Sequence, residues 1–468
     1  MIIMRRQWLV VCMSMGMLVT SRELGALSSL ARNDPYPVYT SLDPQDFLLT
    51  AAKLKIREPD FAGRKKSNAS ISISPFGENA QRGRDLSHRR AVLGDLEGRW
   101  GMIPLLYGPI PPGQTLSPTL QTALSNLFPG VAPGTLSDPS KIDPNQDFGY
   151  FTVPFKYRKR GVRFQLEAII GGGFGVNIET GLASLTQTHT GFVDLTGCVA
   201  PTCPFNPSPL TNAQVIQYLM EPLDQIADEI SLNLCDFSAF SVEEVRINLF
   251  WRQIYELNGE ENEEGYPHLM FIPFVEVSGS VSPADVKDPN KENFNEAFAA
   301  PLGNDDHSAV GFTAGLDFDF VESMEIGAEV GMTYFFKHNF DNFRVPTSQY
   351  QTGIYPYRTS VTITPGFNWH FGAKIAAYHF IDKLSGYFQY IQMEHKQDSI
   401  HLRKCEDEGI FLPEVLECRS SFMAKMANIA LNYDISPNIG LGVFAQLPLD
   451  QRNAYRTTTI MLSFNASF

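Results

Sequence analysis

Residues 457–468 read TTTIMLSFNASF, and their side chains alternate between apolar and polar almost without a break. A period of two places successive side chains on opposite faces of a β-strand. The apolar face carries Ile460, Leu462, Phe464, Ala466 and Phe468. A strand of this kind leaves an open backbone edge unless it pairs with another strand, and a closed barrel provides that partner. The segment therefore predicts the last strand of a closed β-barrel.

The same residues resemble the C-terminal strand of bacterial outer-membrane β-barrel proteins, which end in a phenylalanine, here Phe468. The resemblance covers this strand closely and the rest of the chain only as a pattern of alternation. It implies a porin-like transmembrane barrel in the bacterial outer membrane. It also implies that Phe468 is a recognition feature for the barrel-assembly machinery.

The composition is consistent with a membrane β-barrel. The 468 residues have a net charge of -14, which argues against nucleic-acid binding. No internal run of about twenty apolar residues exists, so a helical membrane protein is excluded. The mean hydropathy of -0.13 suits strands of which one face is polar.

The chain divides into three parts. Residues 1–26 have the form of a signal peptide, with Arg5 and Arg6 before an apolar core at Trp8–Val19. Residues 27–90 are expected to form a periplasmic N-terminal arm. Residues 91–468 are expected to form an outer-membrane barrel with an extracellular insertion at 177–242, partly helical because residues 212–232 show helical spacing.

The fold class expected is all-β, a transmembrane antiparallel up-and-down barrel of about twelve strands with long extracellular loops. Fourteen strands remain an alternative if 173–185 holds a turn and a further strand. If Phe468 lies at the periplasmic end, every short connection lies there too. The twelve segments are Leu93–Tyr107, Phe148–Arg158, Val162–Val176, Glu243–Glu256, His268–Val281, Ser308–Val321, Met324–Lys337, Val361–Phe380, Leu384–Lys396, Phe422–Asp434, Asn438–Leu447 and Ala454–Phe468.

The charged side chains are expected to face the lumen, since a charge that faces lipid costs up to about 2–4 kcal/mol. Two walls of opposite charge follow, one basic and one acidic. The predicted pore-lining residues are Lys156, Arg158, Arg163, Arg246 and Arg252 on the basic wall and Asp317, Asp319, Glu325 and Glu329 on the acidic wall.

Two functions remain open. The first is an outer-membrane porin-like channel for passive diffusion of small hydrophilic solutes or ions through this charge-segregated lumen. The second is a plugged structural barrel, filled by a salt-bridge network, whose extracellular loops bind a partner or host surface. Inward glycines such as Gly327 and Gly331 favour a pore or room for an inserted segment. Outer-membrane lipid is the expected surrounding, and a homo-oligomer is compatible with the pattern.

No catalytic motif occurs, so the chain is not expected to be an enzyme, and no cofactor or metal site is expected. The cluster Asp305, Asp306 and His307 is interpreted as a solvated loop. Export permits disulfides, and the spacing favours Cys405–Cys418 and Cys198–Cys203. Cys235 is then left over, or it competes for one cysteine of the first pair.

Overall fold

The computed structural model describes most of the chain from Ala69 to Phe468. The described ranges are 69–96, 98–136, 149–189, 191–195, 202–203, 210–257, 269–281, 307–320, 324–381, 383–436 and 438–468. The expected signal peptide and most of the expected arm lie outside these residues.

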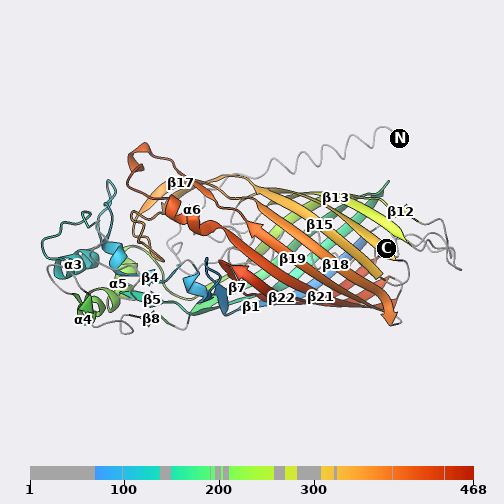
Figure 1. Cartoon of the computed structure of the whole chain (residues 1–468), viewed down its shortest axis with the longest axis horizontal. Helices are drawn as coiled ribbons and strands as arrows, with labels where there is room; N and C mark the ends of the chain where they lie inside the picture. Colours follow the sequence, from blue (N-terminus) through green and yellow to red (C-terminus); the bar gives the residue numbers. More distant parts are fainter. Residues whose placement is uncertain are drawn as a thin grey trace.

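Twelve antiparallel strands close into a transmembrane barrel (Figure 1). They follow one another around the barrel in chain order, and the circle is completed where the last strand pairs with the first. The barrel strands are β1 (Ala69–Ala80), β6 (Phe155–Gly171), β7 (Phe174–His189), β11 (Phe237–Arg252), β13 (Met270–Val281), β14 (Ala309–Phe320), β15 (Met324–Phe335), β18 (Asn368–Ile381), β19 (Leu384–His395), β21 (Phe422–Ser436), β22 (Ile439–Arg452) and β24 (Thr458–Ser467).

The first barrel strand is β1, which corrects the expected boundary at residue 90. Ala69 and Phe468 exchange two backbone hydrogen bonds of 3.1 and 3.0 Å, and β1 pairs with β24 on one side and β6 on the other. The segment 93–107 was expected to be the first strand. Its described residues, 93–96 and 98–107, instead include two 3₁₀ turns and the short strand β4 (Trp100–Gly101). Only two outward positions of β1, Ile71 and Ile73, are strongly apolar, and Pro75, Gly77 and Asn79 follow them on the same face, so the apolar alternation of this strand is short.

The expected hairpin at Lys159-Arg160-Gly161 is wrong. These residues lie inside β6, which runs unbroken over seventeen residues. The turn comes later, at Gly171 to Gly173, where three consecutive glycines adopt positive φ values that other residues rarely tolerate. β7 then occupies residues that had been assigned to the insertion at 177–242. The strand number stays at twelve because these errors compensate one another.

The two ends of the barrel differ. Ala69 and Phe468 lie at one end, called here the terminal end, with the connections 172–173, 253–269, 321–323, 382–383 and 437–438. The opposite end, called here the loop end, receives the connections 81–154, 190–236, 282–308, 336–367, 396–421 and 453–457. The expected segment Val361–Phe380 is two strands, because Pro365 and Gly366 separate β17 (Arg358–Thr364) from β18.

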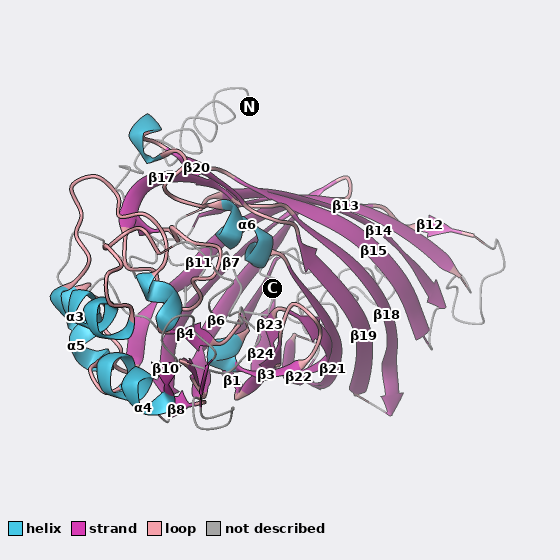
Figure 2. Ribbon diagram, turned by 60° about the vertical axis from the view of Figure 1, so that its left-hand side comes forward, coloured by secondary structure: helices cyan, strands magenta, loops and turns pink. Residues whose placement is uncertain are grey.

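The described parts of the loops at the loop end fold into a cap, which Figures 1 and 2 show beyond one end of the barrel. Buried apolar residues lie at the centre of this cap. The helix predicted over 212–232 is present as three consecutive helical segments, of which the second and third pack against α3 (Pro118–Leu127). Ser117 caps α3, since its hydroxyl accepts a hydrogen bond from the backbone N–H of Leu120.

The helical segments of this end are η1 (Leu93–Asp95), η2 (Ile103–Leu106), α3, α4 (Asn212–Val215), η5 (Ile216–Met220), α5 (Leu223–Glu229), η6 (Cys405–Asp407) and α6 (Glu414–Ser420). Its short strands are β2 (Arg82–Arg84), β3 (Arg90–Val92), β4, β5 (Tyr150–Thr152), β8 (Val193–Asp194), β9 (Thr202–Cys203), β10 (Leu210–Thr211), β16 (His338–Arg344), β17, β20 (Ser399–Leu402) and β23 (Ala454–Tyr455). At the terminal end, β12 (Tyr255–Glu256) pairs with β13. Among the described helices, none has both the length and the apolar character needed to cross a membrane.

Barrel closure between β1 and β24 can be tested by a disulfide. Ser70 and Ser467 are paired in register, next to a pair that exchanges two hydrogen bonds. Their Cα atoms are therefore expected about 4.5 Å apart, within disulfide reach. In a background with the native cysteines replaced by serine, Ser70→Cys with Ser467→Cys should cross-link on oxidation and migrate differently on a non-reducing gel.

The matched control is Ser74→Cys with Ser467→Cys, whose positions are out of register. Equal cross-linking of both variants would contradict the register of β1.

Candidate functional site

The inner wall of the barrel is the first candidate site. Along each strand the outward side chains are mostly apolar and exposed, while the inward ones include most of the charged residues. Arg163, Arg246, Asp317, Asp319, Glu325 and Glu329 lie on the inner face and are less than a tenth exposed, and Arg252 is inward near the terminal end. These seven predicted residues are thus on the wall where the sequence placed them. Whether that wall conducts stays a prediction.

Lys156 and Arg158 do not face the lumen. Because β6 is continuous, Lys156 and Arg158 lie on the same face of the strand as Arg160 and Val162. Both are exposed on the outer face of the barrel. The inward positions at this level are Tyr157 and Lys159. This prediction is wrong because a turn was expected at 159–161. A turn placed inside a continuous strand reverses the predicted inward and outward directions of the side chains on one side of it.

One buried ion-pair cluster links β1, β6 and β11. Glu243 accepts a contact of 2.6 Å from Lys159 Nζ and hydrogen bonds of 3.0 Å from Arg163 Nε and Nη2. Arg163 Nη2 also lies 3.2 Å from Glu78 Oε1. A second basic side chain of this wall, Arg246, pairs with Glu179.

A second cluster links β14, β15 and β18. Lys374 Nζ lies 3.0 Å from Asp317 Oδ1 and 2.7 Å from Glu325 Oε1. His370 Nε2 lies 3.6 Å from Glu329 Oε1. All five side chains are buried, so the lysine and the three carboxylates depend on their neighbours rather than on bulk water for stabilisation of their charges.

Inward glycines make these clusters possible. Gly327 lies in register between Lys374 and Asp317, and a Cβ at Gly327 would meet both side chains. Gly181 stands opposite Arg163, and a Cβ there would meet Glu243 and Arg163. The glycine positions are therefore occupied by long side chains of the neighbouring strands. The expectation that inward glycines leave space for a pore is therefore wrong at Gly327 and Gly181, where neighbouring side chains fill that space.

The two expected walls of opposite charge are also corrected. The basic wall contains acids: Arg246 pairs with a carboxylate of the adjacent strand β7, and Lys159 on β6 pairs with Glu243 on β11, the next strand but one. Among the described inward side chains, carboxylates still outnumber basic groups. The carboxylates are Glu78, Glu167, Glu179, Glu243, Glu244, Glu276, Asp317, Asp319, Glu325, Glu329 and Asp434; the basic groups are Lys159, Arg163, Arg246, Arg252 and Lys374.

Sequence reasoning missed Lys159, Glu78, Glu179 and Glu243. An alternation carried through residue 159 to the three glycines at 171–173 would have placed Lys159 inward. Glu243 lies at a β-bulge between Val242 and Val245, where two residues face one partner position and the alternation is interrupted. The alternation of apolar and polar residues therefore does not predict whether the Glu243 side chain faces inward or outward.

Part of the inner wall is apolar, which the alternation did not predict. Phe76, Met461 and Phe444 face inward in one cross-strand row over β1, β24 and β22, and all are buried. The Arg163 guanidinium lies 4.2 Å from the centre of the Phe76 ring. This row connects the cluster around Arg163 to the apolar interior of the cap.

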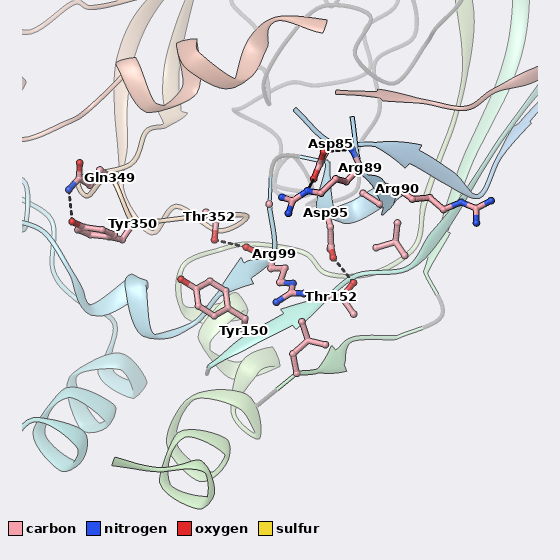
Figure 3. Close-up of a pocket in the computed structure, with 14 residues that line it drawn as sticks. Asp85, Arg89, Arg90, Asp95, Arg99, Tyr150, Thr152, Gln349, Tyr350 and Thr352 are labelled. Atoms are coloured by element: carbon pink, nitrogen blue, oxygen red, sulfur yellow. Dashed lines mark hydrogen bonds and ion pairs between the residues drawn. The ribbon is translucent and has the colours of Figure 1, made fainter. Parts of the chain in front are cut away.

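The second candidate site is a polar pocket of about 790 Å³ in the cap (Figure 3). Its walls come from 85–99, β5, residue 195 and the segment 349–352. Three arginines, two tyrosines and two aspartates line it, namely Arg89, Arg90, Arg99, Tyr150, Tyr350, Asp85 and Asp95. This volume suits a small organic solute, and the lining offers hydrogen-bond donors and acceptors.

Asp95 is the most constrained of these groups. It accepts hydrogen bonds of 2.5 Å from Thr152 Oγ1 and 3.1 Å from the backbone N–H of Val153. Burial raises the pKa of Asp95, and these hydrogen bonds together with Arg99 oppose the shift. Asp85 binds the Arg89 guanidinium at 3.2 Å and the backbone N–H groups of Ser87 and Arg89.

Arg344 ties two loops of the cap together. Its guanidinium donates to the carbonyl oxygens of Ile230 and Ser231 after α5, at 2.5 and 3.2 Å, and to that of Tyr355 at 2.7 Å. Burial, with Arg358 nearby, lowers the pKa of Arg344 to about 9, so the group remains charged at neutral pH. A cation at the C-terminal end of a helix also complements the helix dipole.

The expected Cys405–Cys418 disulfide is not formed, and both residues are free and exposed. Leu416 and Ser420 form the buried face of α6. Cys418 is two residues from each, which places it on the opposite, exposed face of this helix. Cys235 is also free, whereas Cys198 and the side chain of Cys203 lie outside the described residues, as do Asp305 and Asp306. His307 is buried, with Nδ1 at 2.8 Å from the Phe336 carbonyl oxygen. The described residues contain no cluster suited to a metal ion.

No known protein family matches the chain, and no curated protein matches it. Among solved structures, an outer membrane channel from Pseudomonas putida F1 is similar at 9% identity and a TM-score of 0.45, over 86% of this chain and 97% of that chain. The toluene transporter TbuX of Ralstonia pickettii is similar at 9% identity and a TM-score of 0.34, over 95% and 99%. The NanC porin is similar at 8% identity and a TM-score of 0.29, over 66% and 94%. The barrel assignment rests on this chain's own strand pairing.

Removal of Lys374 should destabilise the barrel. Lys374→Met leaves Asp317 and Glu325 buried without this cation, a change that typically costs about 3–5 kcal/mol. We expect a lower temperature for loss of the folded, heat-modifiable band on a gel. Lys337→Met, which removes an exposed lysine, should leave that temperature nearly unchanged.

Adding Asp317→Asn and Glu325→Gln to Lys374→Met should restore part of the loss. If Lys374→Met unfolds at the wild-type temperature, the cluster is not a stabilising unit.

Removal of Arg344 should loosen the cap. Arg344→Met leaves buried carbonyl groups with fewer donors, at about 1–3 kcal/mol for each unsatisfied group. We expect faster cleavage of the cap by a protease while the barrel remains folded. Arg403→Met is the control, because Arg403 forms an exposed ion pair with Asp341. Equal protection of wild type and Arg344→Met would contradict the role of this guanidinium.

Proposed function

We propose that this chain is an outer-membrane transport barrel that carries small hydrophilic solutes or ions and is closed in the conformation described. The observation that supports it most is the density of ionisable groups on the inner wall. Buried ion pairs are often no more stabilising than apolar residues of the same volume. Ionisable groups inside a membrane protein commonly mark a solute or ion path.

The proposed location is the bacterial outer membrane, with the terminal end in the periplasm and the cap outside. The support is the contrast between the connections, which are mostly short at the terminal end and mostly long at the loop end. Phe468, exposed on the outer face at the terminal end, is proposed as the recognition residue for barrel assembly.

Transport requires that the covered inner wall open. The inward charged groups are almost all buried, so a conducting state must move the side chains or segments that cover them. Because carboxylates outnumber basic groups on this wall, an open lumen is expected to prefer cations. The polar pocket of the cap is proposed as the place where a solute first binds before it reaches the barrel.

The second candidate is a filled structural barrel whose loops bind a partner or host surface. The buried inner wall and the inward row of Phe76, Met461 and Phe444 favour it. The folded cap would then be the functional part.

Single-channel recording separates the two functions. The full chain, folded and heat-modifiable, is reconstituted in a planar bilayer under a salt gradient. We expect discrete current steps with a reversal potential that indicates cation preference. Asp319→Asn with Glu329→Gln should move that potential towards zero, because two inward carboxylates are neutralised.

Asp341→Asn, which neutralises an exposed carboxylate of the cap, is the control and should leave the reversal potential unchanged. Silence from a demonstrably folded barrel, over a range of voltages, would exclude the channel and favour the second candidate.

A further inference from the structure

A row of cations lies on the outside of the barrel. Lys156, Arg158 and Arg160 alternate along β6 and are all exposed on its outer face. Figure 2 shows β6 beside β7, close to the cap. The row therefore points towards the lipid that surrounds the barrel rather than into the lumen.

The position of the row matches the edge of the hydrocarbon layer. Outward positions on the same strand run from Ile170 near the terminal end to Val162, and they are apolar. The eight residue steps from Val162 to Ile170 span about 27 Å along the strand. A tilt of about 35–45° reduces this to about 20 Å of height, slightly less than the apolar band of a typical barrel. Arg160 thus lies at the boundary, and Arg158 and Lys156 lie at headgroup depth.

The neighbouring outward side chains are polar and uncharged. Lys156, Arg158 and Arg160 are paired in register with residues of β7 that carry hydroxyl groups, namely Thr188, Thr186 and Ser184. On the β1 side, Asn79 is paired with Arg158 and Gly77 with Arg160. No carboxylate therefore stands beside the row on either flanking strand within the described residues.

Cations elsewhere near the loop end are arranged differently. Lys396 and Arg452 lie 2.9 and 3.7 Å from Glu394. Arg84 and Lys425 lie 3.6 and 3.9 Å from Asp450. The row on β6 thus has no acid beside it among the described residues of the flanking strands, whereas each of these four cations lies beside a carboxylate, Glu394 or Asp450, that it shares with one other cation.

We infer that the outer face of β6 binds the phosphate groups of anionic lipids in the leaflet at the loop end. Guanidinium groups donate two parallel hydrogen bonds to a phosphate, and the lysine adds a point charge. The hydroxyl groups of Ser184, Thr186 and Thr188 are suitably placed on the adjacent strand to donate further hydrogen bonds. The apolar positions below the row hold the acyl chains.

Lipid nanodiscs test the inference. The full chain is reconstituted with phosphatidylglycerol or with zwitterionic phosphatidylcholine, and bound lipid is counted by native mass spectrometry. Juxtamembrane cations contribute about fivefold each to anionic-lipid affinity. Lys156→Gln with Arg158→Gln and Arg160→Gln should therefore weaken phosphatidylglycerol retention at least tenfold.

The matched control is Lys396→Gln with Lys425→Gln and Arg452→Gln, which removes the same charge from the acid-paired positions and should retain the lipid. A charge-conserving variant, Lys156→Arg with Arg158→Lys and Arg160→Lys, should also retain it. Equal retention by wild type and the β6 glutamine variant, or an equal loss in the control, would overturn the inference.

A separate measurement distinguishes lipid from free phosphate. Inorganic phosphate added to phosphatidylcholine nanodiscs should not raise the unfolding temperature of the wild-type barrel, whereas phosphatidylglycerol should. If inorganic phosphate raises it as much as phosphatidylglycerol does, the row is a site for a free anion and the assignment to lipid fails.

Discussion

The structure depends on the closure of the sheet. In a hydrocarbon layer every backbone N–H and C=O must find a partner within the protein, and a circle of paired strands meets that demand without an edge. The pairing of β1 with β24 completes the circle and brings Ala69 and Phe468 together. Because the circle fixes the pairing register of each strand with its neighbours, it also fixes which residues face lipid and which face inward.

The inward residues then have to share a narrow interior. The solution on β14, β15 and β18 is an interlocking of large and small residues: Lys374 passes over Gly327 to reach Asp317. Arg163 passes over Gly181 to reach Glu243 in the same way. Charge compensation is thus local to each side of the wall. Any transport function has to work with these paired groups rather than with two opposed charged walls.

The outer face and the cap contribute properties of their own. The cap joins loops that are distant in the sequence, as Arg344 does when it binds the carbonyl groups that follow α5. The outer face of β6 changes from apolar to basic towards the loop end. Both features surround the mouth of the barrel and set what a solute or a lipid meets there.

The sequence by itself determined the fold class, the last strand and the direction of Asp317, Asp319, Glu325 and Glu329, because strict alternation on long strands leaves one possible parity. It did not determine where β1 begins, because the outward face of that strand is apolar only at Ile71 and Ile73. Nor did it determine that β6 continues through Lys159-Arg160-Gly161, because a glycine there resembles a turn. Lys156 and Arg158 were therefore placed on the wrong face. Only the tertiary structure decided the partners of each inward charge, because those partners come from neighbouring strands whose register the chain's local pattern does not contain.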